Sequence, residues 1–134
     1  MSKPLSFQII LPVPMDNAIE RFTAALKTEG FGVITRIDNH KVFKEKLGVD
    51  FRPYVILGVC NPKLAHDAIN VDASVGLFLP CKATVEAVDE GTLISIVNPE
   101  IVLQQEAFQD TAIVTEFAPE ARARLLRVIE ALQA

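Results

Sequence analysis

One short segment constrains the possible folds more than any other part of the chain: residues 54–60 read YVILGVC and lead directly into Asn61 and Pro62. Apolar side chains fill both alternating positions of the run, which is typical of a strand covered on both faces of its sheet. Asn is a favoured helix N-cap, and Pro suits the first position of a helix. The segment therefore predicts a buried strand that ends at Cys60 and leads into a helix over residues 62–70.

Strand and helix patterns alternate before this junction. Residues 5–11 are rich in large and β-branched apolar side chains, which predicts a first strand. A helix is expected to begin at Asp16, which can act as N-cap, and to end at Gly30 in the left-handed conformation. Residues 32–38 predict a second strand, and residues 39–47 predict a short helix capped by its first residue. The buried face of the first helix is expected to carry Met15, Ile19, Phe22 and Leu26.

The clearest hairpin of the chain turns at residues 89–91, with a run of β-forming residues on each side. If Val88 pairs with Thr92 across a three-residue turn, Ile94 and Ile96 lie on the outer face of the hairpin. An exposed apolar face of this kind usually marks an interface. We therefore expect a homodimer that forms partly through Ile94 and Ile96.

An amphipathic helix ends the chain, whereas residues 100–116 give no readable pattern. A chain of 134 residues, half of them hydrophobic, is long enough to bury a core of its own. We expect a single α+β domain over residues 1–134, with an antiparallel sheet packed on helices. The inward positions of the last helix are expected to be Ala121, Leu125, Val128, Ile129 and Leu132.

The composition argues against several classes of partner. The net charge of −4 leaves no positive field for the phosphate backbone of a nucleic acid or for an acidic membrane surface. The chain has no run of roughly 18 apolar residues, so we expect no membrane span, and its first residues are not typical of a signal peptide. We therefore expect a cytoplasmic protein. Two cysteines in a chain of this length do not form a disulfide framework.

Cys60 and Cys81 are the first candidates for chemistry. A thiol at the start of a helix has its pKa lowered by the helix dipole, and Lys63 lies about one turn further on. Cys60 also ends an apolar strand, where burial raises the pKa, and Cys81 follows the apolar run LFLP. The exits of neighbouring strands can bring two cysteines within disulfide reach. A thiol-based enzyme or redox sensor and an inert buried pair are therefore both open alternatives.

Other catalytic and cofactor signatures are absent from the sequence. The glycines form no phosphate-binding loop, and no Gly-x-Ser-x-Gly elbow occurs. Cys60, Cys81, His40 and His66 are residue types that bind zinc, but no two of them have the close spacing of a recognisable site. We therefore expect a binding protein rather than an enzyme, with no catalytic residues, no metal and no cofactor.

The start of the helix after Cys60 is a candidate binding site. Backbone N–H groups near Asn61, together with Lys63, can hold a carboxylate or a phosphate. The main hypothesis is a homodimeric binding domain for a small ligand, with an anion as one option, held by Cys60, Asn61, Lys63 and Cys81. The alternative for this helix is a self-satisfied N-cap beside an exposed lysine. For the whole protein, a structural dimer that acts through a protein partner is a further alternative.

Three stretches of the chain, GVCNPKLAHDAI, VGLFLPCKATVEAVDEG and ISIVNPE, resemble the domain of unknown function 302 family over residues 5–103. The motifs CNP and LPC, separated by a helix and an apolar strand, carry the resemblance. It implies dimers and a fold like that of the TATA-box-binding protein, with the element order β-α-β4-α. It does not imply nucleic-acid binding here, because this chain lacks a basic surface. The motif positions, whose role in the family is not established, are Cys60, Asn61, Pro62, Lys63, Pro80 and Cys81.

Overall fold

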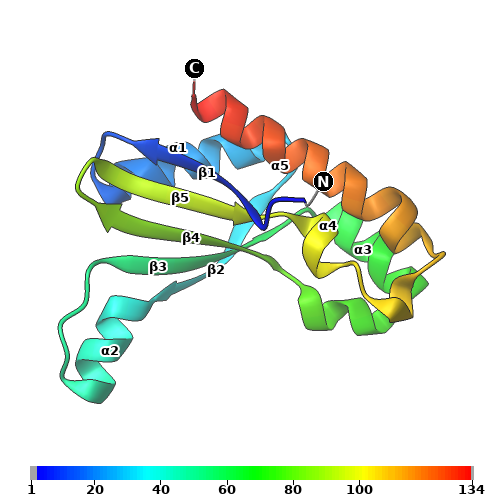
Figure 1. Ribbon diagram of the computed structural model, residues 1–134, viewed down its shortest axis with the longest axis horizontal. Coiled ribbons are helices and arrows are strands. Elements are labelled where there is room, and N and C mark those ends of the chain that lie inside the picture. Colours follow the sequence, from blue (N-terminus) through cyan, green and yellow to red (C-terminus); the bar gives the residue numbers. More distant parts are fainter. Residues whose placement is uncertain (1–2, 134) are drawn as a thin grey trace.

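The computed structural model describes residues 3–133 and shows a five-stranded antiparallel sheet (Figure 1). The strands lie in the order β1-β5-β4-β3-β2, and every neighbouring pair is antiparallel. They are β1 (Ser6–Leu11), β2 (Gly32–Asp38), β3 (Tyr54–Cys60), β4 (Cys81–Val88) and β5 (Gly91–Val97). The expected α+β class with an antiparallel sheet is confirmed. Residues 1, 2 and 134, which belong to the expected domain, lie outside the described residues.

Helices connect the strands and close the chain. They are α1 (Met15–Thr28), α2 (Asn39–Leu47), α3 (Pro62–Val71), α4 (Pro99–Val102) and α5 (Ala118–Leu132). Two 3-10 turns, η1 (Ala73–Phe78) and η2 (Glu106–Phe108), and a π-helical turn, η3 (Ile113–Phe117), complete the described elements. The apolar strand expected between the CNP and LPC motifs is wrong, because η1 takes its place after α3. The main order agrees with β-α-β4-α, with α2, α3 and α4 as additions. Within residues 3–133, no helix combines the length and the apolar character needed to cross a membrane.

The main core lies between the sheet and the helices α1 and α5, which pack against each other on one face (Figure 1). Phe22 and Leu26 of α1 and Leu125 of α5 are fully buried there. Burying a side chain of this size contributes about 1.5–3 kcal/mol to folding. The inward positions expected for both helices are confirmed, because all of them are buried in the main core or packed against it.

The caps of α1 and α2 correct two details of the sequence analysis. Pro14 precedes α1 and is its cap residue, so Asp16 lies inside the first turn, where its negative charge still favours the helix N-terminus. The cap of α2 is Asp38 rather than Asn39, which is the first helical residue. The end of α1 is as expected, because Gly30 takes a left-handed φ of 81°.

A smaller apolar cluster lies beside the main core, near the junction of β3 and α3. Phe78 and Phe108 meet there edge to face, with ring centroids 5.9 Å apart. The segment 100–116, which supplies much of this cluster, consists of turns of three to five residues. Such turns are too short to show a hydrophobic period, which explains why the segment has no readable pattern. The buried members of the cluster are Ala68, Val75, Leu103, Phe108, Ile113 and Ala118.

The register of the β4–β5 hairpin differs from the predicted register by one residue. Val88 pairs with Gly91 rather than with Thr92, so the turn has two residues instead of three. Gly91 has a φ of 138°, and a Cβ there would lie 2.2 Å from the carbonyl oxygen of Leu11 in β1. A shift of one residue turns every side chain of a strand to the opposite face of the sheet.

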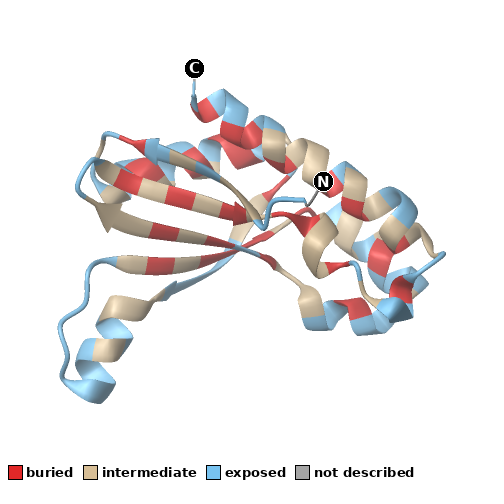
Figure 2. Ribbon diagram, viewed as in Figure 1, coloured by how far each residue is buried: buried red, intermediate tan, exposed pale blue. Residues whose placement is uncertain are grey.

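Ile94 and Ile96 therefore point into the main core, and both are 0% exposed. The expectation that they lie on an outer face and form a dimer interface is wrong. Figure 2 shows the alternation of buried and half-buried residues along β5. The residues of β5 on the outer face are Leu93, Ser95 and Val97.

The outer face of the sheet, opposite α1 and α5, carries apolar side chains among polar and charged ones and is partly exposed. Tyr54 and Ile56 of β3 are only half-buried, so the expectation that this strand is covered on both faces is wrong. Ile10 pairs with Leu93 on the same face and is 44% exposed, and Ile37 pairs with Ile56 and is 46% exposed. Helix α2 lies beside the end of β3 and buries none of its own residues (Figure 2).

The observed register predicts that neighbouring residues of β5 differ strongly in their contribution to stability. Ile94→Ala should lower the free energy of unfolding by about 2–5 kcal/mol, because it leaves a cavity in the main core. Leu93→Ala on the outer face should cost about 1 kcal/mol, because less apolar surface is lost from the interior. Urea denaturation measures both values. Equal losses in the two variants would contradict the register.

Candidate functional site

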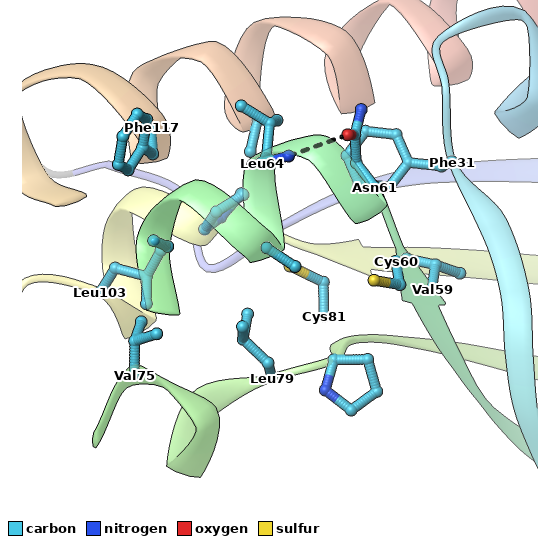
Figure 3. Close-up of a pocket in the computed structure, with 15 residues that line it drawn as sticks. Phe31, Val59, Cys60, Asn61, Leu64, Val75, Leu79, Cys81, Leu103 and Phe117 are labelled. Carbon is cyan, nitrogen blue, oxygen red and sulfur yellow. Dashed lines mark hydrogen bonds between the residues drawn. The ribbon is translucent and has the colours of Figure 1, made fainter. Parts of the chain in front are cut away.

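A small cavity lies at the end of the sheet where β3 leads into α3 and β4 begins (Figure 3). Its volume is about 40 Å³, and its lining is almost entirely apolar. Leu79 and Leu103 contribute to the walls, and the polar groups are the thiols of Cys60 and Cys81 and the amide of Asn61. A space of this volume holds roughly one to three water-sized groups.

Asn61 makes the turn from β3 into α3. Its Oδ1 accepts a hydrogen bond from the Leu64 N–H at 3.1 Å, and Pro62 occupies the first turn of the helix. The predicted N-cap is confirmed. Asn61 is 8% exposed, so this hydrogen bond forms where bulk water has little access. The Leu64 N–H, which has no partner within the helix, therefore finds its partner in the Asn61 side chain.

The amide nitrogen of Asn61 connects this junction to the end of α1. Its Nδ2 donates a hydrogen bond to the Glu29 carbonyl oxygen at 3.4 Å. Arg124 of α5 donates to the same oxygen at 3.0 Å, and Arg127 pairs with the Glu29 carboxylate at 2.8 Å. A glycine is needed at position 30, because a Cβ atom added to Gly30 would lie only 2.9 Å from Asn61 Nδ2. The junction is therefore bound to both helices of the main core.

The two cysteines meet at the cavity from neighbouring strands. Cys81 begins β4 and pairs with Val59, the residue directly before Cys60 in β3. Both side chains line the cavity, and neither forms a disulfide. Cys81 is 8% exposed, whereas Cys60 is half-buried. Pro80 lies next to the two cysteines and packs closely on Gly58. A Cβ atom added to Gly58 would lie 2.7 Å from the Pro80 ring.

Burial raises the pKa of both thiols. Desolvation raises the pKa of Cys81 to about 11, with a smaller contribution from the nearby Cys60 and an opposing one from the Lys82 ammonium group. Desolvation also raises the pKa of Cys60. Of the two opposing effects considered for Cys60, burial is the one that agrees with the raised pKa. Both groups are protonated thiols at neutral pH.

Lys63 lies outside the cavity. Its Nζ is 2.7 Å from the Asp67 carboxylate, one turn further along α3, and its side chain is 80% exposed. The side-chain oxygen of Asn61 is already bound to the Leu64 N–H. The start of α3 thus has the form of a self-satisfied N-cap beside an exposed lysine. The structure brings Cys60, Asn61 and Cys81 together and leaves Lys63 apart from them.

The four residues considered as zinc ligands do not come together as one group, because the two histidines do not line the cavity of the two cysteines. His66 lies on the exposed side of α3, with a side chain that is 75% exposed. His40 lies on α2, where its Nδ1 accepts a hydrogen bond from the Tyr54 N–H at 3.0 Å. Among residues 3–133, no group of three or more metal-binding side chains is present.

The far wall of the cavity contains residues that the sequence analysis misses. Phe117 comes from the π-helical turn η3, and Leu103 follows α4. Both lie in or beside the segment without a readable pattern, so no periodicity marks them as neighbours of Cys60. A π-helical turn is often found at functional sites, but it becomes visible only in the folded chain.

The fold and the site define a small α+β protein with an apolar cavity that carries two thiols. The chain belongs to the family described as Domain of unknown function DUF302, whose sequence pattern matches residues 7–132. The resemblance to this family is thereby confirmed, and the match reaches beyond the predicted end at residue 103.

A solved structure supports this assignment. The crystal structure of an uncharacterized conserved protein DUF302 from Bacillus stearothermophilus is 32% identical in sequence to this chain. The match covers 96% of this chain and 98% of that chain, with a TM-score of 0.82. The comparison with curated proteins finds no match.

The raised pKa of Cys81 predicts a loss of stability in alkaline solution. The unfolded chain releases this proton near the ordinary pKa of 9.0, whereas the folded chain holds it up to about 11. Between these values the folded state binds more protons, so the free energy of unfolding falls as the pH rises, by about 2–3 kcal/mol in total. Urea denaturation at about pH 8 to pH 11 measures this loss.

Cys81→Ala is the matched control for this experiment. It removes the buried thiol and should make the free energy of unfolding depend less on pH over the same range, since only the half-buried Cys60 then contributes. An identical alkaline loss in the wild type and in Cys81→Ala would show that other groups cause it.

Proposed function

We propose that the protein is a binding domain whose ligand occupies the cavity formed by Cys60, Asn61 and Cys81. The observation that carries the proposal is the cavity itself, an apolar space with two thiols where the CNP and LPC motifs meet. Protein interiors are close-packed and contain few voids larger than a water molecule. An open space at the junction of both motifs therefore supports a binding role.

The lining supports a ligand that contacts carbon and sulfur. A carboxylate or phosphate in this cavity would lose its water without gaining a cation, because the lining contains no lysine, arginine or histidine. Lys63 pairs with Asp67 on the outside of α3. The anionic option therefore has less support than an uncharged or soft ligand.

The alternative of a thiol-based enzyme or redox sensor has one observation in its favour, the placement of Cys60 and Cys81 on the same cavity. The raised pKa of each thiol opposes it, because the thiolate is the nucleophile in thiol chemistry. A protein that binds a ligand through neutral thiols agrees better with this environment.

We further propose that the protein is a homodimer in which a second copy covers the outer face of the sheet. Antiparallel sheets commonly bury one face and leave the other to solvent, where polar side chains are usual. Here Ile10 and Ile37 are exposed by 44% and 46% on that face, beside the half-buried Leu93 and Ile56. A surface of this kind is typical of an interface.

The outer face carries charges of both signs, and Glu86 already pairs with Arg52 of its own chain at 2.8 Å. The central strand β4 carries Lys82, Thr84 and Glu86 on this face. A twofold axis through Thr84 brings Lys82 of one copy opposite Glu86 of the other, and the reverse. Such opposite charges fix the register of two apolar faces. This symmetry favours a second copy over a different protein partner as the covering layer.

Xenon is a suitable probe of the cavity, because it is an apolar and polarisable atom that enters small dry cavities. NMR spectra of the reduced protein under increasing xenon pressure should show saturable shifts of the backbone amides of Cys60, Asn61 and Cys81. Ala65→Leu, which fills the cavity from α3, should abolish these shifts. Ala24→Leu adds the same side chain to the exposed side of α1 and should leave them unchanged. Saturable shifts that survive in Ala65→Leu, or their absence in the wild type, would contradict binding in this cavity.

Sedimentation velocity tests the dimer. We expect a dimer at micromolar concentration and a monomer for Ile10→Glu, which places a charge on the apolar outer face. Leu77→Glu is the matched control, because Leu77 lies on η1, away from the sheet, and is 83% exposed. A wild-type monomer at this concentration, or equal behaviour of both variants, would refute the proposed interface.

A further inference from the structure

Two cysteines from neighbouring strands line the same cavity. Cys81 pairs with Val59 across the β3–β4 ladder, and Cys60 is the next residue of β3. Both side chains line the same cavity, and Cys60 is close enough to raise the pKa of Cys81. Figure 3 shows Cys60 and Cys81 at the cavity, with Leu79 among the residues that line it.

The remaining lining restricts the ligands that such a pair can bind. Zinc in proteins takes four nitrogen, sulfur or oxygen ligands, and the described part of the chain has no group of three side chains of this kind. Calcium and magnesium need several oxygen ligands and retain water. A soft monovalent cation differs from these ions, because two thiolate sulfurs on opposite sides satisfy it.

We propose that Cys60 and Cys81 together bind one soft monovalent cation, Cu(I) or Ag(I), between their sulfur atoms. The inference rests on the proposed function, because it uses the same cavity and names the class of its ligand. The space of about 40 Å³ is large enough for a bare ion but excludes the full water shell of a hard cation. The apolar walls also shield the bound ion from water.

Binding exchanges two protons for the metal ion. Each S–H bond breaks as a sulfur–metal bond forms, both protons pass to the solvent, and no atom changes its oxidation state. Two thiolates and one monovalent ion carry one net negative charge. The cavity lining contains no cation, so this charge is stabilised from outside the lining by the exposed Lys82, the residue after Cys81, whose charge already lowers the pKa of that thiol. The half-buried Cys60 provides the route by which the ion enters.

An anaerobic titration of the reduced protein with Cu(I), in competition with the coloured chelator bicinchoninate, measures the affinity. We expect one Cu(I) per chain. Cys60→Ala and Cys81→Ala should each lower the affinity by more than about a hundredfold. Mutating a residue that only hydrogen-bonds to a metal ligand typically lowers metal affinity about ten- to hundredfold, and loss of a ligand itself should cost more. Release of two protons predicts that the affinity rises about a hundredfold for each pH unit near neutrality.

Met15→Leu is the matched control, because it removes a sulfur atom at the start of α1, away from the cavity. Its Cu(I) affinity should equal that of the wild type. Circular dichroism and thermal unfolding establish that each alanine variant is folded. Alanine replaces the thiols without adding a polar group to the apolar lining, which favours folded variants.

The inference is overturned if the Cu(I) affinity survives either alanine substitution, because one thiol alone would then suffice. It is also overturned if the wild type binds no more tightly than Cys60→Ala, or if the affinity is independent of pH. The xenon experiment distinguishes these failures from failure of the proposed function, since xenon needs the cavity and not the thiolates. Saturable xenon shifts without tight Cu(I) binding reject the metal ion alone. Absence of both rejects the cavity as a binding site.

Discussion

The two hydrogen bonds of the Asn61 side chain are the interaction on which the rest of the site depends. The oxygen caps α3 through the Leu64 N–H, and the nitrogen donates to the Glu29 carbonyl at the end of α1, where Arg124 of α5 also donates. Because Asn61 is buried, removing either partner leaves a polar group unsatisfied at a cost of about 1–3 kcal/mol. A short side chain that both accepts and donates is required here, and an amide meets this requirement. The same side chain holds Cys60 at the edge of the cavity.

The second constraint is the close approach of β1 to the β4–β5 turn. Gly91 leaves room for the Leu11 carbonyl oxygen, and the two-residue turn that results places Ile94 in the main core. The apolar residues of the outer face then come from other positions, such as Leu93 and Ile10. The close approach at Gly91 thus belongs to the register that decides which side chains fill the core and which lie on the outer face.

The sequence predicts the elements whose signals are local. The helical period of α1 and α5, the Asn-Pro start of α3 and the left-handed Gly30 all lie within one stretch of chain, and the structure agrees with each of them. The hairpin register could not be predicted this way, because residues 89–91 suit turns of two or three residues and the local sequence does not distinguish them. The same limit applies to the site. Spacing in the sequence cannot show that Cys60 and Cys81 share a cavity, because their proximity depends on the pairing of β3 with β4.

Burial also determines the chemistry of this cavity. An apolar lining stabilises neutral thiols, so the resting site carries no charge that attracts an anion or a hydrated hard cation. In the proposed function, a ligand gains most binding free energy in this cavity if it prefers sulfur to water, because the lining offers it contacts with sulfur and carbon. An ion that displaces the thiol protons competes with those protons for the sulfur atoms. The raised pKa values therefore weaken its binding at low pH, and its binding becomes stronger as the pH rises. In the proposed function, the desolvation that makes Cys60 and Cys81 poor nucleophiles therefore also favours soft ligands over charged, hydrated ones.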